Sequence, residues 1–95
     1  MVSVILTQSA KQDFYQIYNN LELISPAYSK SFALRFNQIV IKISKFPQLG
    51  RIVPEIENPR IRELFDNKYR VIYRIKSDDE IEILMIYHGA RDLKI

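Results

Sequence analysis

The chain has 95 residues and a mass of 11.3 kDa, which suffices for one domain and is too little for two. Apolar residues make up 47% and charged residues 26%, a globular composition that excludes a disordered or collagen-like chain. The absence of cysteine excludes a disulfide scaffold, a cysteine-ligated zinc site and a thiol nucleophile, and the single histidine excludes a multi-histidine metal site.

The net charge is +3, from 14 Lys and Arg against 11 Asp and Glu. This mild excess is too small to indicate direct binding to duplex DNA. The longest uninterrupted apolar run, residues 83–87, has the length of a strand and is too short to cross a membrane. No basic region followed by an apolar stretch marks a secretion signal, so we expect a cytoplasmic protein that does not associate with membranes.

The first half of the chain predicts a strand followed by two helices. β-Branched residues at 2–7 predict the strand. Ser9 and Gln12 form a capping-box pattern, and an apolar stripe at helical spacing predicts a helix from about residue 9 to 24. Ser25-Pro26 ends this helix and starts a second one, because serine suits an N-cap and proline suits the first helical position.

The second predicted helix ends at Phe46-Pro47, so the two helices form a hairpin with a very short connection. This helix also carries Leu34 and Ile41 outside its main apolar stripe. Since small domains need wide apolar faces, we expect a wide buried face, with a groove for a partner as the alternative.

The second half predicts an ordered loop and three strands. Residues 47–60 hold three of the four prolines together with apolar residues that need cover. Strands are expected at 61–65, 69–76 and 81–88, and residues 77–79 form the turn between the last two. The order is then β-αα-βββ, an α+β fold with the helical hairpin packed on a mostly antiparallel sheet.

Charge pairs predict the register of the last two strands. Pairing Lys76 with Glu80 also places Arg74 opposite Glu82, which gives two opposite-charge pairs. In this register the face expected to lie under the helices carries Tyr69, Val71, Tyr73, Ile75, Ile81, Ile83, Met85 and Tyr87. The opposite face carries Arg70 and His88 as near neighbours, and we expect it to be an open contact surface.

The side chains that could carry chemistry lie mostly near the strand ends or in the preceding loop: Arg51, Glu55, Arg60, Arg62, Glu63, Arg70, Arg74, Tyr87, His88 and Arg91. His88 could act as a general acid, because imidazole titrates near neutral pH. Arg70 or Arg62 could hold a phosphate, and Glu55 could accept a proton from a ribose 2′-hydroxyl. These groups would make a ribonuclease without metal or cofactor. The alternative is structural, with a hydrogen-bonding histidine and solvated arginines.

Three segments resemble the RelE/ParE superfamily of small bacterial toxins from type II toxin–antitoxin systems, also known as plasmid stabilisation proteins. They are VILTQSAKQDFYQIYNNL, where a strand runs into a helix, ISKFPQLGRIVPE after the second helix, and RIRELFDNKYRVIYRIKSDDEIEILMIYHGARDL. The resemblance covers nearly the whole chain and implies a single toxin domain over residues 1–95. It also implies a cognate antitoxin that wraps the toxin with an extended segment, over the hairpin groove or the open sheet face.

The resemblance leaves the target open between two branches. RelE-like members cut messenger RNA on the ribosome, whereas ParE-like members poison DNA gyrase and are not known to catalyse a reaction. The long hairpin, the segment FPQLGR and the ending YHGARDL resemble the ParE-like branch. We therefore expect a gyrase poison, with ribosome-dependent cleavage of messenger RNA as the alternative. A degenerate toxin that only binds its antitoxin is the third hypothesis.

Several residues nevertheless match the nuclease pattern. Glu55, Arg70 and His88 resemble the general base, phosphate-binding arginine and general acid of YoeB-type relatives, and the secondary candidates are Arg62, Tyr87 and Arg91. ParE-like proteins also often keep a histidine at the position of His88. Lys42 and Lys45 resemble the lysines of RelE, but the chain ends Asp-Leu-Lys-Ile without the tyrosine that RelE uses.

Overall fold

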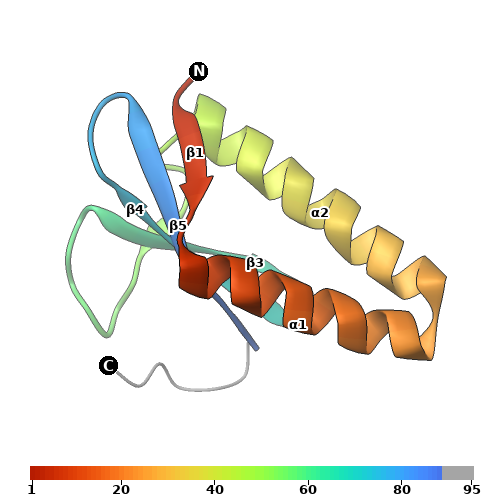
Figure 1. Ribbon diagram of the computed structural model, residues 1–95. Coiled ribbons are helices and arrows are strands. Elements are labelled where there is room, and N and C mark those ends of the chain that lie inside the picture. The colour runs from red at the N-terminus through yellow and green to blue at the C-terminus, as the bar shows by residue number, and fades with distance from the viewer. Residues whose placement is uncertain (89–95) are drawn as a thin grey trace.

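The computed structural model describes residues 1–88, which fold as a helical hairpin on one sheet (Figure 1). The elements are β1 (Ser3–Leu6), α1 (Gln8–Ile24), α2 (Pro26–Lys45), β2 (Arg51–Ile52), β3 (Ile61–Asp66), β4 (Tyr69–Ile75) and β5 (Glu80–His88). The sheet has five strands in the order β1-β5-β4-β3-β2, and only the β1–β5 pair is parallel in this part of the chain. The predicted α+β fold is confirmed.

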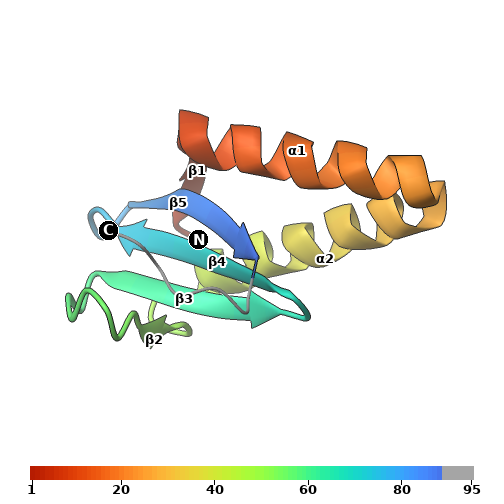
Figure 2. The same ribbon diagram turned by 90° about the horizontal axis from the view of Figure 1, so that it is seen from below.

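The helices lie together on one side of the sheet, and the tip of their hairpin projects beyond the strands (Figure 2). Between the two layers is the main core, built from aliphatic residues of β4 and β5 and from the inner face of the hairpin. Phe14 of α1 packs against α2. Its ring centroid lies 5.3 Å from that of Phe32 and 5.1 Å from that of Phe36.

Each helix begins at a side-chain N-cap, and the sequence predicted one of the two caps correctly. Ser25 caps α2, since its hydroxyl accepts from Ala27 N at 3.2 Å and Pro26 opens the helix, as expected. The predicted capping box at Ser9 is wrong. Thr7 caps α1 instead, because its Oγ1 accepts from Ala10 N at 3.1 Å and also donates to Leu84 O at 3.0 Å. The second bond ties the helix start to β5.

The second helix does not have the wide buried face that we expected. Leu34 is 66% exposed and Ile41 is 41% exposed, so both apolar side chains face outward from the hairpin. The buried apolar residues of α2 form a narrower stripe of Phe32, Phe36, Ile39 and Ile43.

The register of β4 and β5 agrees with the prediction at one end and departs from it at the other. Arg74 lies opposite Glu82 and forms an ion pair with it. The register then shifts, because Tyr73 pairs with Ile83 and Ile72 pairs with Met85, which leaves Leu84 as an extra residue. A single extra residue reverses the alternation of every side chain after it.

The shift corrects the predicted faces of the sheet. Ile86 lies opposite Val71 and is buried in the main core, whereas Met85 and Tyr87 point to the other face. His88 lies opposite Tyr69 on the helix side. The expectation that Arg70 and His88 are neighbours on one face is therefore wrong.

The face opposite the helices is also less open than predicted. The loop after α2 supplies the short strand β2, which pairs with β3 and was not expected from the sequence. The same loop places Val53 against Ile72, and both are fully buried in a second, smaller core. Val53 and Ile56 of the loop thus cover the sheet around Ile72, whereas Leu49 and Ile52 remain exposed.

The capping result gives a direct test. Thr7→Ala should lower the free energy of unfolding by about 1–2 kcal/mol, because it removes the cap and the bond to Leu84 O. The matched variant Ser9→Ala should change it by less than about 0.5 kcal/mol, since Ser9 is exposed and does not cap the helix. Urea denaturation measures both. Equal losses in the two variants would contradict the assignment of the cap.

Candidate functional site

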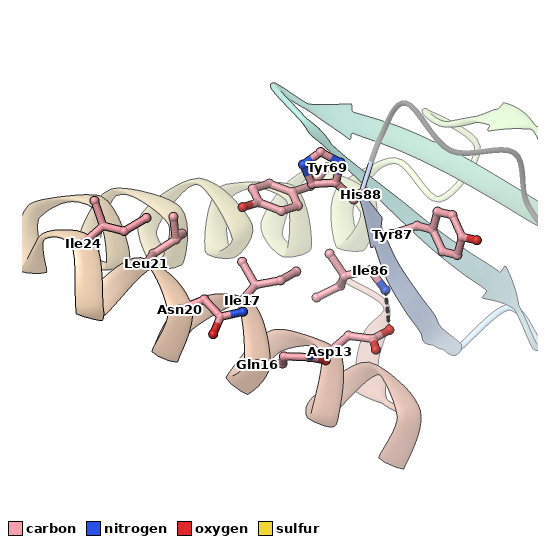
Figure 3. Close-up of a pocket in the computed structure, with 10 residues that line it drawn as sticks. All are labelled: Asp13, Gln16, Ile17, Asn20, Leu21, Ile24, Tyr69, Ile86, Tyr87 and His88. Atoms are coloured by element: carbon pink, nitrogen blue, oxygen red, sulfur yellow. Dashed lines mark hydrogen bonds between the residues drawn. The ribbon is translucent and has the colours of Figure 1, made fainter.

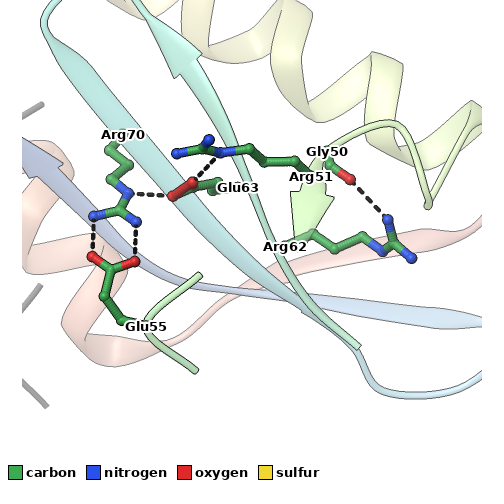
Figure 4. A network of polar contacts seen from close by, with 6 residues as sticks. All are labelled: Gly50, Arg51, Glu55, Arg62, Glu63 and Arg70. Atoms are coloured by element: carbon green, nitrogen blue, oxygen red, sulfur yellow. Dashed lines mark hydrogen bonds and ion pairs between the residues drawn. The ribbon is translucent and has the colours of Figure 1, made fainter. Parts of the chain in front are cut away.

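Four charged residues from three strands and the loop form one ion-pair cluster, the Arg70 network: Arg51, Glu55, Glu63 and Arg70 (Figure 4). Glu63 of β3 lies directly opposite Arg51 of β2, and its carboxylate accepts from Arg51 Nε at 2.6 Å. The other oxygen of this carboxylate accepts from Arg70 Nε. The strands therefore bring two arginines onto one carboxylate.

Arg70 makes its remaining bonds to the loop. Its Nη1 and Nη2 donate to the two oxygens of Glu55 at 3.0 and 2.8 Å, the parallel geometry that a guanidinium and a carboxylate prefer. Arg70 is only 4% exposed and Glu63 only 1%, whereas the side chain of Glu55 remains 32% exposed. The centre of the network is thus buried at Arg70 and Glu63, and its two ends reach solvent at Glu55 and Arg51.

The carboxylates of Glu55 and Glu63 stabilise the charged form of Arg70. Hydrogen bonding to Glu55 raises the pKa of Arg70 above its ordinary value, burial opposes this, and Glu63 adds to the rise. Three nitrogen atoms of the guanidinium already donate to carboxylates. The site therefore already holds two carboxylates beside Arg70, which occupy three of the five N–H groups of its guanidinium.

A second polar cluster fixes the start of the loop beside this network. The hydroxyl of Tyr73 accepts from Gly50 N at 2.9 Å and donates to Pro47 O at 2.6 Å. Burial raises the pKa of the Tyr73 hydroxyl, which keeps the proton that this second bond needs. A Cβ at position 50 would lie 2.7 Å from Glu63 O and 2.8 Å from the Tyr73 hydroxyl oxygen, so the close approach requires glycine.

The other predicted arginines also have structural contacts. Arg62 donates from Nη1 to Gly50 O at 2.9 Å (Figure 4) and, outside that view, from Nε to Pro59 O at 3.0 Å. Arg60 donates to the carbonyl of Lys76 at 3.1 Å, and Arg74 pairs with Glu82. These side chains hold the loop and the last hairpin in place.

His88 lies in a different part of the molecule. It lines a groove of about 500 Å³ between α1 and the ends of β4 and β5, together with Tyr69 and Ile86 (Figure 3). The rings of His88 and Tyr69 meet edge to face, with centroids 5.8 Å apart. Across the groove, Asp13 Oδ2 accepts from Ile86 N at 3.0 Å. The groove therefore joins residues of α1 to the end of the sheet.

The predicted catalytic residues are thus only partly brought together. Glu55 and Arg70 are in direct contact, and Tyr87 lies opposite Arg70 in the β4–β5 pair. His88 is on the other face of the sheet, and Arg91 lies outside the described residues. Lys42 and Lys45 lie in the last turn of α2. Over residues 1–88, His, Asp and Glu form no cluster that could hold a metal ion.

Two features of these sites could not be predicted from the sequence. The groove residues of α1, such as Asp13, Gln16 and Asn20, are polar positions on a helix face and show no pattern that predicts a partner. Phe65 is half exposed, with the guanidinium carbons of Arg51 and Arg70 lying 5.6 and 5.9 Å from its ring centroid. Both features depend on contacts between distant parts of the chain.

Comparisons with known proteins assign this fold to a family of toxins. The family described as the ParE toxin of the type II toxin–antitoxin system parDE matches residues 4–93. The chain belongs to this ParE toxin family. Membership implies an antitoxin as its partner.

A solved structure supports the same assignment. The chromosomal ParDE toxin–antitoxin system from P. aeruginosa contains a chain with 26% sequence identity and a TM-score of 0.73. The match covers 93% of this chain and 96% of that one. A search of curated proteins finds no significant match. None of the helices within residues 1–88 is long and apolar enough to cross a membrane.

The Arg70 network predicts an asymmetric effect of its residues on stability. Arg70→Ala should lower the free energy of unfolding by about 3–5 kcal/mol, because it leaves the buried carboxylate of Glu63 with less compensation. Glu55→Ala should lower it by only about 1–2 kcal/mol, because water can reach the groups it uncovers. Urea denaturation of both variants checks this, and a larger loss in Glu55→Ala would contradict the proposed structure of the network.

Proposed function

We propose that this ParE-family toxin poisons DNA gyrase in the bacterial cytoplasm, and that its cognate antitoxin neutralises it by direct binding. The family match over residues 4–93 supports a toxin of this branch. The observation that carries the choice of target is the placement of the residues that a nuclease would need. Arg70 is held by two carboxylates on one face of the sheet, while His88 lies on the other face.

This placement argues against the ribonuclease alternative on chemical grounds. A general acid must come within hydrogen-bond reach of the leaving oxygen, and the phosphate between acid and base needs a cation with free donors. Arg70 uses Nε, Nη1 and Nη2 for Glu55 and Glu63, and both oxygens of Glu55 accept from Arg70. Arg70 and Glu55 are thus held mainly by each other and by Glu63, and the sheet separates both from the imidazole.

A gyrase poison has no such requirement. It has to bind its target through a stable surface, and no proton transfer takes place on the toxin. The network, the buried Tyr73 hydroxyl and the loop clamp of Arg62 would then serve to hold the loop on the sheet. This role accounts for the burial of charges that a catalytic site would leave accessible to its substrate.

The test uses purified toxin with DNA gyrase and supercoiled or relaxed plasmid. We expect inhibition of supercoiling together with trapped, cleaved DNA. In a parallel reaction with ribosomes, messenger RNA should remain intact. Cleavage of the messenger by folded toxin, with no effect on gyrase, would overturn the proposal in favour of ribosome-dependent cleavage.

One substitution distinguishes gyrase poisoning from the ribonuclease alternative. Glu55→Gln keeps the shape of the side chain and removes the carboxylate that would act as the general base. Gyrase inhibition by this variant should stay within about threefold of the unmodified toxin, because no proton transfer is involved. A folded Glu55→Gln protein that loses toxicity by a hundredfold or more, on the scale of a lost catalytic base, would contradict the gyrase assignment.

A further inference from the structure

The strand β1 lies at one end of the sheet, so within residues 1–88 one of its edges has no neighbouring strand. Ser3 N and Thr7 N both donate toward β5, each at 3.0 Å. Because the backbone groups of a strand alternate between its two edges, those of Val4 and Leu6 point away from β5 to the free edge. A free edge of this kind is a template for another strand.

The edge of β1 lacks the residues that usually keep sheet edges from pairing. Proteins protect exposed edges with charged residues, prolines or very short strands. The other end of the sheet follows this rule, because β2 has two residues and one of them is Arg51. By contrast, residues 2–7 read Val-Ser-Val-Ile-Leu-Thr and contain neither a charge nor a proline. The sequence of β1 therefore favours pairing with a further strand.

A hollow of about 540 Å³ lies beside this edge and is bounded by β1 and both helices. The helices spread apart from the tip of their hairpin toward β1, which crosses the open side (Figure 1). Val4 and Leu6 line the hollow together with Phe14 and Phe36. Ile5 also lines it and is 46% exposed. Apolar side chains of an added strand would therefore meet apolar contacts on this side of the sheet.

A second copy of the chain fits this edge in one register. Two β1 strands related by a two-fold axis run antiparallel, and their hydrogen-bonded pairs must be residues whose backbone groups point outward. An axis through Ile5 meets this condition, because Val4 then lies opposite Leu6 of the partner subunit. Each of these pairs exchanges both of its backbone hydrogen bonds. The two half-exposed Ile5 side chains meet on the axis and cover each other.

The charges near the edge do not oppose this pairing. Glu82, the residue of β5 beside Ile5, is already paired with Arg74. Lys11 lines the hollow and follows the Leu6 end of β1 in the chain. Antiparallel pairing places the two Lys11 side chains at opposite ends of the joined strands, which keeps these like charges apart.

We infer that the free toxin associates with a second copy of itself, through antiparallel pairing of the two β1 strands about Ile5, which joins the two sheets into one. This inference goes beyond the proposed function and does not depend on the target, because it concerns the toxin alone. The contact is short, so we expect a reversible dimer with a dissociation constant in the micromolar range.

Sedimentation velocity of purified toxin without antitoxin tests the association. The unmodified toxin should form a dimer as its concentration rises. Ile5→Glu places like charges on the axis and should weaken dimerisation at least about tenfold. The matched variant Leu23→Glu adds the same charge at the hairpin tip, where Leu23 is 87% exposed, and should leave dimerisation unchanged. A toxin that stays monomeric at about 500 µM, or equal effects of the two variants, would overturn the inference.

Cross-linking tests the register, because the chain contains no cysteine of its own. Ile5→Cys would place two thiols on the axis with a Cα separation of about 4.5 Å, which a disulfide can bridge. The matched variant Ser3→Cys would place its thiols roughly 13 Å apart, on opposite sides of the axis. With oxidised glutathione, Ile5→Cys should form covalent dimers at least about tenfold faster than Ser3→Cys. Equal rates would contradict the pairing about Ile5.

Amide hydrogen exchange distinguishes a second copy from other occupants of the edge. The Leu6 amide should exchange at least about tenfold more slowly in concentrated than in dilute toxin, because it gains a carbonyl partner in the dimer. The Ser3 amide, which already donates toward β5, serves as the control and should not change. Slow exchange of Leu6 at every concentration would indicate another segment of the same chain. Slow exchange only with antitoxin would indicate that partner, and either result would overturn the inference.

Discussion

The extra residue in β5, Leu84, determines on which face of the sheet the side chains of Ile86, Tyr87 and His88 lie. Up to Ile83 the strand keeps the register set by the Arg74–Glu82 pair, and after Leu84 every side chain changes face. Ile86 then completes the core under the helices, and Tyr87 joins the face of Arg70. His88 is carried to the groove beside α1. Without this shift, His88 and Arg70 would share a face, and a nuclease centre would be geometrically plausible.

The Arg70 network lies on the face of the sheet opposite the helices. A buried ion pair is a weak source of net stability, because the loss of hydration offsets most of the attraction between the charges. Here it connects β2, β3, β4 and the loop through two guanidinium groups and two carboxylates, so its contribution is to fix the loop on the sheet. Gly50 and Tyr73 complete this fixation, since their close approach leaves no space for a side chain at position 50. Glu55 and Arg70, which resemble part of a catalytic set, thus also have structural contacts in this ParE-family member.

Much of the fold could be predicted from local patterns, and the site could not. The hairpin followed from Ser25-Pro26 and the apolar stripes, and the last strand pair followed from opposite charges near its turn. The α1 cap was misassigned, because Thr7 gains its role partly from Leu84, a residue far away in the sequence. The exposure of Leu34 and Ile41 depends on how α1 and the sheet meet α2. The shift at Leu84 has no local marker such as glycine or proline, so the faces of Ile86 and His88 required the structure.

The most direct test of the central claim removes the two buried charges of the network while keeping the protein folded. The double variant Glu63→Leu/Arg70→Met replaces the buried pair by apolar groups, a change that other buried ion pairs tolerate without loss of stability. Trapping of cleaved DNA by gyrase should be measured with this variant once its folding has been verified by circular dichroism. If the network only holds the loop on the sheet, the folded double variant should trap cleaved DNA as the unmodified toxin does. A folded double variant that is inactive on gyrase, when the unmodified toxin is active, would contradict the structural role assigned to Arg70.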